Sequence, residues 1–128
     1  MLRKGKGIEI LVFKHPLAGI QLVKGTIELG ETSADAALRE LAEEAGILNA
    51  QIIDNIGVWQ PGYDQVWAFY LCKTNESLPS SWTHFTSDDG GKEFEFFWHP
   101  VFDDPSLDWH DIFCNALFYI RCWLASSE

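Results

Sequence analysis

Apolar and β-branched residues in the first half of the chain gather in stretches of strand length. Ile8 to Phe13 and Ile20 to Val23 are two such stretches, and Ala50 to Trp59 is a third, longer one. Stretches of this kind predict β-strands. The sequence therefore places two short strands before residue 31 and a long strand after residue 49.

The segment Gln65 to Cys72 is apolar at both alternating sets of positions. One set is Val66, Ala68 and Tyr70, and the other is Trp67, Phe69 and Leu71. Because successive side chains of a strand point to opposite faces, both faces of this strand would need cover. The pattern predicts a buried central strand.

The C-terminal half continues with a polar segment, a strand and a helix. Lys73 to Gly91 is rich in Ser, Asp and Gly and is too long for a tight turn, which predicts a functional or mobile loop. Glu93 to Val101 resumes as a strand, and Leu107 to Leu124 has helical periodicity with Ser106 or Asp108 as its cap. The order of strands, helix, strands and helix fits an α/β/α sandwich.

Glu31 to Ala45 predicts the first helix. Thr32 or Ser33 can serve as its N-cap, and Gly46 is the residue expected to end it. Apolar residues recur along it at steps of three and four, which is the spacing of a buried helical face. This helix separates the two groups of strands.

Length and charge narrow the class of protein. The chain has 128 residues, 47% of them apolar, which predicts a single domain covering residues 1–128. It lacks long apolar runs, which predicts a cytoplasmic protein without a membrane span. The formal net charge of −10 makes large nucleic acids unlikely partners. Small anionic substrates stay open, because a bound cation would supply positive charge.

Three glutamates on the predicted helix stand at i, i+3 and i+4. Glu40, Glu43 and Glu44 would share one face, where like charges repel by about 0.2 to 0.5 kcal/mol for each i,i+4 pair. One interpretation is an ordinary solvated helix in which Arg39 pairs with Asp35 or with Glu43. The other is a site for Mg²⁺ or Mn²⁺, since clustered carboxylates are the hard oxygen ligands that these cations prefer.

The residues around these glutamates favour the metal site. The segment from Gly25 to Ile47 matches the pattern G-x5-E-x7-R-E-U-x-E-E-x-G-U at every specified position, U being aliphatic. The matching residues are Gly25, Glu31, Arg39, Glu40, Leu41, Glu43, Glu44, Gly46 and Ile47. By this pattern, the Nudix box, the chain resembles the Nudix hydrolase family. The resemblance implies a Nudix-type α/β/α sandwich with a mixed β-sheet between helices.

The resemblance also implies a set of site residues. Carboxylates matching Glu40, Glu43 and Glu44 bind divalent metal in the family, usually Mg²⁺, often together with the carbonyl that precedes the first glycine, here that of Lys24. The arginine matching Arg39 and the glutamate matching Glu31 have a structural role in the family, in which the guanidinium holds box carboxylates in place by charge-assisted hydrogen bonds.

Family members hydrolyse a nucleoside diphosphate linked to another moiety, by attack of water on a phosphorus. A further glutamate outside the box often acts as base or extra ligand. Glu93 is the first candidate and Glu95, also a candidate substrate contact, is the second, because a strand starting after the polar segment puts both on one face. Glu40 is the third candidate.

Substrate identity follows less directly from the sequence. Three aromatic residues, Trp59, Tyr63 and Trp67, lie on either side of a Gln-Pro-Gly turn where a base could stack. In the family, a tyrosine about sixteen residues past the box, which Tyr63 matches, suggests dinucleoside polyphosphates; a nearby proline, here Pro61, suggests ADP-ribose. A nucleoside triphosphate or dinucleoside polyphosphate is the expected substrate. A non-catalytic nucleotide-binding module is the alternative, and the aromatic strands fit either a monomer or a homodimer.

Overall fold

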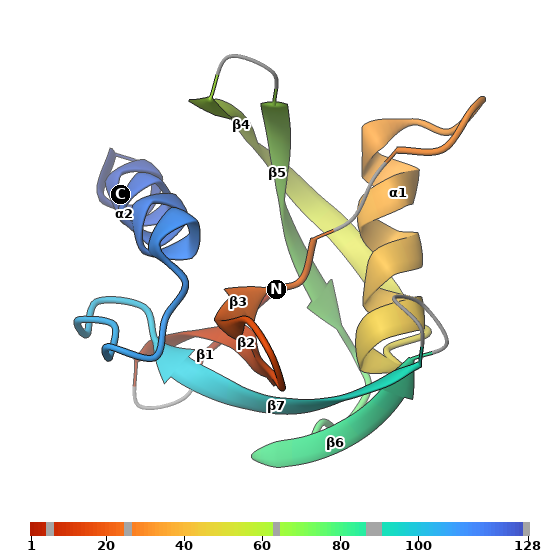
Figure 1. Cartoon of the computed structure of the whole chain (residues 1–128). Coiled ribbons are helices and arrows are strands. Elements are labelled where there is room, and N and C mark those ends of the chain that lie inside the picture. Colours follow the sequence, from red (N-terminus) through yellow and green to blue (C-terminus); the bar gives the residue numbers. More distant parts are fainter. Residues whose placement is uncertain (5–6, 25–26, 63–64, 87–90, 127–128) are drawn as a thin grey trace.

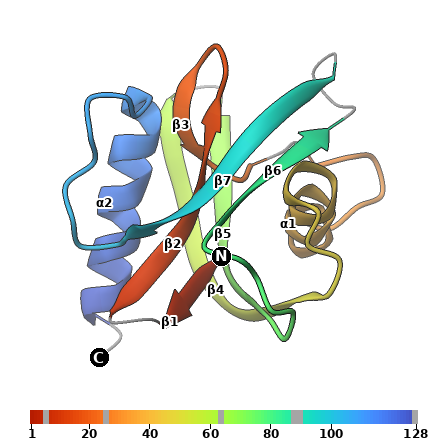
Figure 2. The ribbon, with the colours of Figure 1, turned by 90° about the horizontal axis from the view of Figure 1, so that it is seen from below.

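The computed structural model describes residues 1–4, 7–24, 27–62, 65–86 and 91–126. Two helices flank two β-sheets, and Figures 1 and 2 show the strands between α1 on one side and α2 on the other. The strands are β1 (Leu2–Lys4), β2 (Ile8–His15), β3 (Gly19–Leu22), β4 (Ala50–Gly62), β5 (Gln65–Thr74), β6 (Ser81–Thr86) and β7 (Lys92–Pro100). The helices are α1 (Ser33–Glu40), the π-helical turn η1 (Leu41–Ala45) that continues it, and α2 (Asp111–Ser126).

The larger sheet has five strands in the order β1-β2-β7-β6, and β3 also pairs with β2. These ladders are antiparallel, while Ile20 and Trp109 form a parallel bridge beside them. β1 pairs with the start of β2 and β3 with its end, so both lie along the same strand. The predicted α/β architecture with sheet between two helices is confirmed.

The two faces of β2 carry two separate hydrophobic cores. We call α1 and η1 together the box helix. Leu11 and Phe13 belong to a cluster with Leu41 of the box helix, whereas Ile10 and Val12 belong to a cluster with α2. This division follows from the alternation of side chains along a strand. Four consecutive apolar residues in β2 are therefore all buried, and they anchor the box helix and α2 to opposite faces.

The prediction that Gln65 to Cys72 forms a buried central strand is wrong. β5 pairs with β4 in a separate two-stranded sheet, and Val66 is 66% exposed. Its other apolar set does contact the core: Trp67 and Phe69 pack against the α2 cluster. Apolar residues on both faces thus mark a strand that borders a cavity, described below, rather than a strand in the middle of a sheet.

The polar segment from 73 to 91 also differs from its prediction as a loop, because it contains β6. Trp82, His84 and Thr86 are partly or fully buried while Ser81, Thr83 and Phe85 are exposed. That alternation is the signal of a half-buried edge strand, and the many Ser, Thr and Asp residues of the segment conceal it.

The second helix starts later than predicted. α2 begins at Asp111, and the carbonyl of His110 accepts hydrogen bonds from the N–H groups of Phe113 and Cys114. The preceding residues form a turn, closed by Trp109 N–H donating to Ser106 O, and then pair with β3, since Ile20 N–H donates to Asp108 O and His110 N–H donates to Ile20 O. Neither Ser106 nor Asp108 is the cap, because backbone groups of Asp108 and His110 are hydrogen-bonded to Ile20 of β3 and the helix begins only after them.

Candidate active site in the box helix

The box helix begins and changes its geometry at defined residues. Thr32 is the N-cap, and its side chain accepts a hydrogen bond from Asp35 N–H at 3.1 Å. The helix is α-helical only up to Glu40 and continues as a π-helical turn from Leu41 to Ala45. The sequence predicts one uninterrupted helix, so the π turn is a departure from it; the turn begins directly after Glu40 and contains Glu43 and Glu44. Such turns occur often at functional sites.

Gly46 ends the helix in a left-handed conformation with φ of 76°. The N–H groups of Gly46 and Ile47 donate to the carbonyls of Ala42 and Leu41, which satisfies two groups at the helix end. A Cβ at position 46 would lie 2.9 Å from Nδ1 of His84. The prediction that Gly46 ends the helix is confirmed, and the position has a steric as well as a conformational requirement for glycine.

We expect Gly46→Ala to lower the free energy of unfolding by more than the roughly 1 to 2 kcal/mol that a left-handed conformation costs an L-residue. The His84 ring, already within contact distance, must also move. Gly30→Ala is the matched control, because Gly30 has a φ of 81° but a Cβ there has nothing within 4 Å. Urea unfolding of both variants measures the difference, and equal losses would contradict a role for the His84 contact.

Arg39 is the centre of an ion-pair network that joins the box loop to the helix. Its Nε and Nη2 donate to the two oxygens of Glu31 at 2.8 and 3.1 Å, a bidentate pair. Its Nη1 donates to Glu40 at 2.6 Å and to Glu43 at 3.1 Å, and Glu28 lies 3.6 Å away. One guanidinium therefore fixes the relative positions of four carboxylates, as the resemblance implies for Arg39 and Glu31.

The network shifts the protonation equilibria of its members. The hydrogen bond from Arg39 is the largest cause that lowers the pKa of Glu31 below its ordinary value of 4.5, and the backbone N–H of Glu28 adds to it. The same hydrogen bond raises the pKa of Arg39. Both groups stay charged across the physiological range, so the network persists at neutral pH.

Because the pKa of Glu31 is lowered in the folded state, its contribution to stability is present above pH 4.5 and is lost as the pH falls through the lower, folded-state value. We expect Glu31→Gln to be less stable than the wild type at pH 7, with a difference that shrinks below pH 4.5. Urea midpoints at several pH values measure this, and Glu95→Gln controls for the loss of one charge. A difference that grows on acidification would contradict the prediction.

Glu40 and Glu44 are both shielded from solvent, at least in part. Glu40 is buried, with 7% of the residue exposed, and one oxygen of Glu44 is shielded from solvent. Oxygens of Glu40 and Glu43 lie close together because they share Nη1 of Arg39. The donor chemistry suits Mg²⁺ or Mn²⁺. In the part of the chain that the structure describes, however, no three acidic, His or Cys side chains already stand at metal-binding distances.

Two side chains of β6 bind the C-terminal end of the box helix. Nε1 of Trp82 donates to the carbonyl of Ala45 at 3.0 Å, and Nε2 of His84 lies 3.2 Å from the carbonyl of Glu43. Trp82 also stacks on Phe96 of β7, which fixes its ring. The sequence prediction missed both residues. The alternation of Trp82, His84 and Thr86 within the polar segment was the signal for them.

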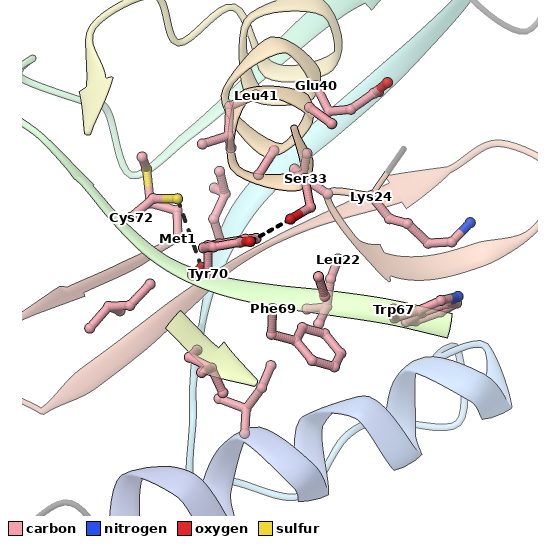
Figure 3. Close-up of a pocket in the computed structure, with 18 of the residues that line it drawn as sticks. Met1, Leu22, Lys24, Ser33, Glu40, Leu41, Trp67, Phe69, Tyr70 and Cys72 are labelled. Atoms are coloured by element: carbon pink, nitrogen blue, oxygen red, sulfur yellow. Dashed lines mark hydrogen bonds between the residues drawn. The ribbon is translucent and has the colours of Figure 1, made fainter. Parts of the chain in front are cut away.

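A cavity of about 530 Å³ lies beside Glu40, between the box helix, β5 and the strands β1 to β3. Figure 3 shows Lys24 and Trp67 near one another at one end and Met1 and Cys72 at the other. The hydroxyls of Ser33 and Tyr70 are hydrogen-bonded to each other between these ends. Nζ of Lys24 lies 5.1 Å from the centre of the Trp67 ring. The cavity therefore joins the carboxylate cluster to an aromatic wall.

The other predicted site residues lie in different places. Trp59 packs on Trp67, Phe69 and Tyr119 within the aromatic cluster that borders α2. Trp67, rather than Trp59, lines the cavity. Two positions, Tyr63 of the predicted substrate contacts and Gly25 of the box, fall outside the described residues.

Glu93 and Glu95 do not join the carboxylate cluster. Both are exposed, and the intervening Phe94, with Phe96, packs in the cluster that contains Leu41 of the box helix. Alternation along β7 therefore turns the two glutamates toward the opposite face. Glu95 is opposite Lys14 and Thr83 in the sheet. Their location favours Glu40 among the three candidate bases.

Comparison with known families identifies the family to which this chain belongs. The NUDIX domain family matches residues 1–109 of the 128-residue chain. Because this match covers most of the chain, the protein belongs to the Nudix family, whose members are hydrolases of small nucleotide substrates and generally use divalent metals. Searches of curated proteins and of solved structures found no match. The resemblance inferred from the box is confirmed.

No helix within the described residues is both long and apolar enough to cross a bilayer. The longest, α2, has 16 residues, and several of its apolar side chains are buried against the sheet.

Proposed function

We propose that the protein is a divalent-metal-dependent pyrophosphohydrolase that cleaves a nucleoside diphosphate linked to another moiety, by attack of water on phosphorus. Nucleoside triphosphates and dinucleoside polyphosphates are the first candidate substrates. The observation that carries the proposal is the intact box: Arg39 orders the carboxylates of Glu40 and Glu43 beside a cavity large enough for a nucleoside.

The carboxylates Glu40, Glu43 and Glu44 would hold Mg²⁺ or Mn²⁺, together with the carbonyl of Lys24. When bound, the cation neutralises the pyrophosphate oxygens and lowers the pKa of the attacking water. Arg39 keeps Glu40 and Glu43 at a common position through hydrogen bonds to Nη1. Trp82 and His84 bind the backbone carbonyls of Ala45 and Glu43, so Glu43 is held both through its side chain and through its backbone.

We infer that Glu40 takes the proton from the attacking water. Glu40 is buried and is one of the residues that line the cavity, whereas Glu93 and Glu95 lie on the outer face of β7. A base must come within hydrogen-bond reach of the water, directly or through one further water, and Glu40 satisfies that requirement best. The proton moves to Glu40 as the new P–O bond forms and the anhydride P–O bond breaks.

A hydrolysis screen tests the proposal. Nucleoside triphosphates, dinucleoside polyphosphates, ADP-ribose and other sugar nucleotides are incubated with the enzyme and Mg²⁺ or Mn²⁺, and products are separated by chromatography. We expect cleavage of a phosphoanhydride bond that requires the cation and that Glu44→Gln abolishes. Metal binding without any cleavage across the panel would instead support a nucleotide-binding module.

A further inference from the structure

The cavity beside Glu40 has walls that are almost entirely apolar or aromatic. Among its described lining residues, the charged side chains are Lys24 and Glu40, and the other polar groups are the N-terminal amine of Met1, the hydroxyls of Ser33 and Tyr70 and the weakly polar groups of Trp67 and Cys72. No Asn, Gln, Asp or Thr occurs among these lining residues. Side chains with fixed donor and acceptor patterns, which read the edge of a base, are thus missing from this part of the wall.

The polar group in the middle of the cavity is the hydrogen-bonded pair of Ser33 and Tyr70 hydroxyls. A hydroxyl is both donor and acceptor, and its hydrogen rotates to suit its partner. The pair can therefore present a donor to an oxo group of a base or an acceptor to an amino group. Such a contact does not distinguish a base that carries an oxo group from one that carries an amino group at the same position.

The aromatic wall at the other end offers a stacking surface. The Lys24 ammonium lies over the ring of Trp67 in the structure, 5.1 Å from its centre. A cation–π contact contributes about 2- to 5-fold to an equilibrium constant, whereas a base stacked on an aromatic ring contributes about 5- to 150-fold. A planar base therefore displaces Lys24 from the ring. The flexible stem of Lys24 then lets its ammonium turn to the phosphates.

We propose that this enzyme accepts nucleotides with any base, because the base is held by Trp67 and apolar walls and the polyphosphate supplies the recognition. The inference rests on the proposed function and names the substrate class of the same site. It means that purine and pyrimidine nucleotides with equal numbers of phosphates are comparable substrates.

The expected range of kcat/KM among the five nucleotides follows from the apolar character of the cavity wall. A hydrophobic pocket separates related substrates by about 10- to 200-fold, whereas a site built to hydrogen-bond a particular group rejects its analogue by about 10⁴- to 10⁵-fold. We expect kcat/KM for ATP, GTP, ITP, CTP and UTP to lie within about 200-fold of one another. A preference for one base of about 10⁴-fold or more would overturn the proposal.

Substitution of Trp67 tests the stacking surface. Trp67→Ala should lower kcat/KM for all five nucleotides by a similar factor of about 5 to 150, while Trp67→Phe, which keeps an aromatic ring, should lower it much less. Circular dichroism and the urea midpoint show whether each variant is folded. A loss confined to one base, or equal losses in folded Ala and Phe variants, would contradict the role of the ring.

A binding experiment separates this inference from the proposed function. Analogues of the five nucleotides with a methylene bridge between the α- and β-phosphorus atoms resist cleavage there, and calorimetry gives their Kd for the intact protein with Mg²⁺. Similar Kd values for the five analogues, all raised by Trp67→Ala, support the inference. They do so even if no triphosphate is hydrolysed, in which case only the proposed hydrolysis fails. Hydrolysis of the nucleotide of one base alone, or a failure of all five analogues to bind, overturns the inference.

Discussion

Replacing Glu44 by glutamine is expected to lower kcat by roughly three orders of magnitude while leaving the protein folded. The amide keeps the size of the side chain but removes the negative charge that a divalent cation needs from its ligand. One oxygen of Glu44 is already shielded from solvent, so water replaces that ligand poorly. Steady-state hydrolysis at saturating Mg²⁺ measures kcat, and Glu43→Gln should behave in the same direction.

Glu93→Gln is the matched control for this experiment. It removes the same charge from a side chain that lies on the outer face of β7, away from the box helix. We expect its kcat to stay within a few-fold of the wild type, by the usual small effect of surface substitutions. A loss in Glu93→Gln equal to that in Glu44→Gln would show that Glu93 reaches the reacting water, contrary to the position of its side chain on the exposed face of β7. Unchanged kcat in both Glu43→Gln and Glu44→Gln would contradict metal-dependent catalysis by the box.

The second large effect is expected at Arg39. Arg39→Ala should weaken Mg²⁺ activation or lower kcat/KM by about 10- to 100-fold, the usual cost of losing a group that orients metal ligands. Four carboxylates, those of Glu28, Glu31, Glu40 and Glu43, would then repel one another without the cation that orders them. The thermal midpoint should also fall, because buried Glu40 loses its charged partner.

Two variants show whether the geometry of Arg39 or only its charge matters. Arg39→Lys keeps the positive charge but cannot form the bidentate pair with Glu31, so we expect partial recovery at most. Arg3→Ala removes a guanidinium whose 2.8 Å ion pair with Glu9 lies outside the box, and activity should be unaffected. Full activity of Arg39→Ala over a Mg²⁺ titration would contradict the ordering role.

The sequence was most informative where local chemistry determines the structure. Thr32 and Gly46 mark the ends of the box helix by capping rules that depend on a few adjacent residues, and both appear in these roles. The apolar runs of β2 and β3 likewise predicted their strands to within two residues. The spacing of the box residues identified the family and, with it, the carboxylates that Arg39 binds.

The sequence was least informative where distant segments meet. The bridge between Ile20 and Trp109 moves the start of α2 toward the C-terminus. Rules based on neighbouring residues cannot predict a pairing between residues so far apart in the sequence. The hydrogen bonds from Trp82 and His84 to the box helix join residues about forty positions apart. For β5, apolar side chains on both faces were consistent with a central strand or with a cavity wall, and only the arrangement of the other strands distinguishes them.

The π turn after Glu40 has a consequence for the spacing of the box itself. A π turn accommodates one more residue than an α-helical turn, so removing a residue from Leu41–Ala45 would restore a regular hydrogen-bond ladder. Because a π-helix turns by less per residue than the roughly 100° of an α-helix, the segment beyond Ala45 would keep nearly the same orientation after the deletion. A deletion between Glu40 and Glu43 would instead change the angle at which Glu43 and Glu44 leave the helix relative to Glu40. The number of residues between these glutamates therefore sets their relative orientation, and the π turn is part of that spacing.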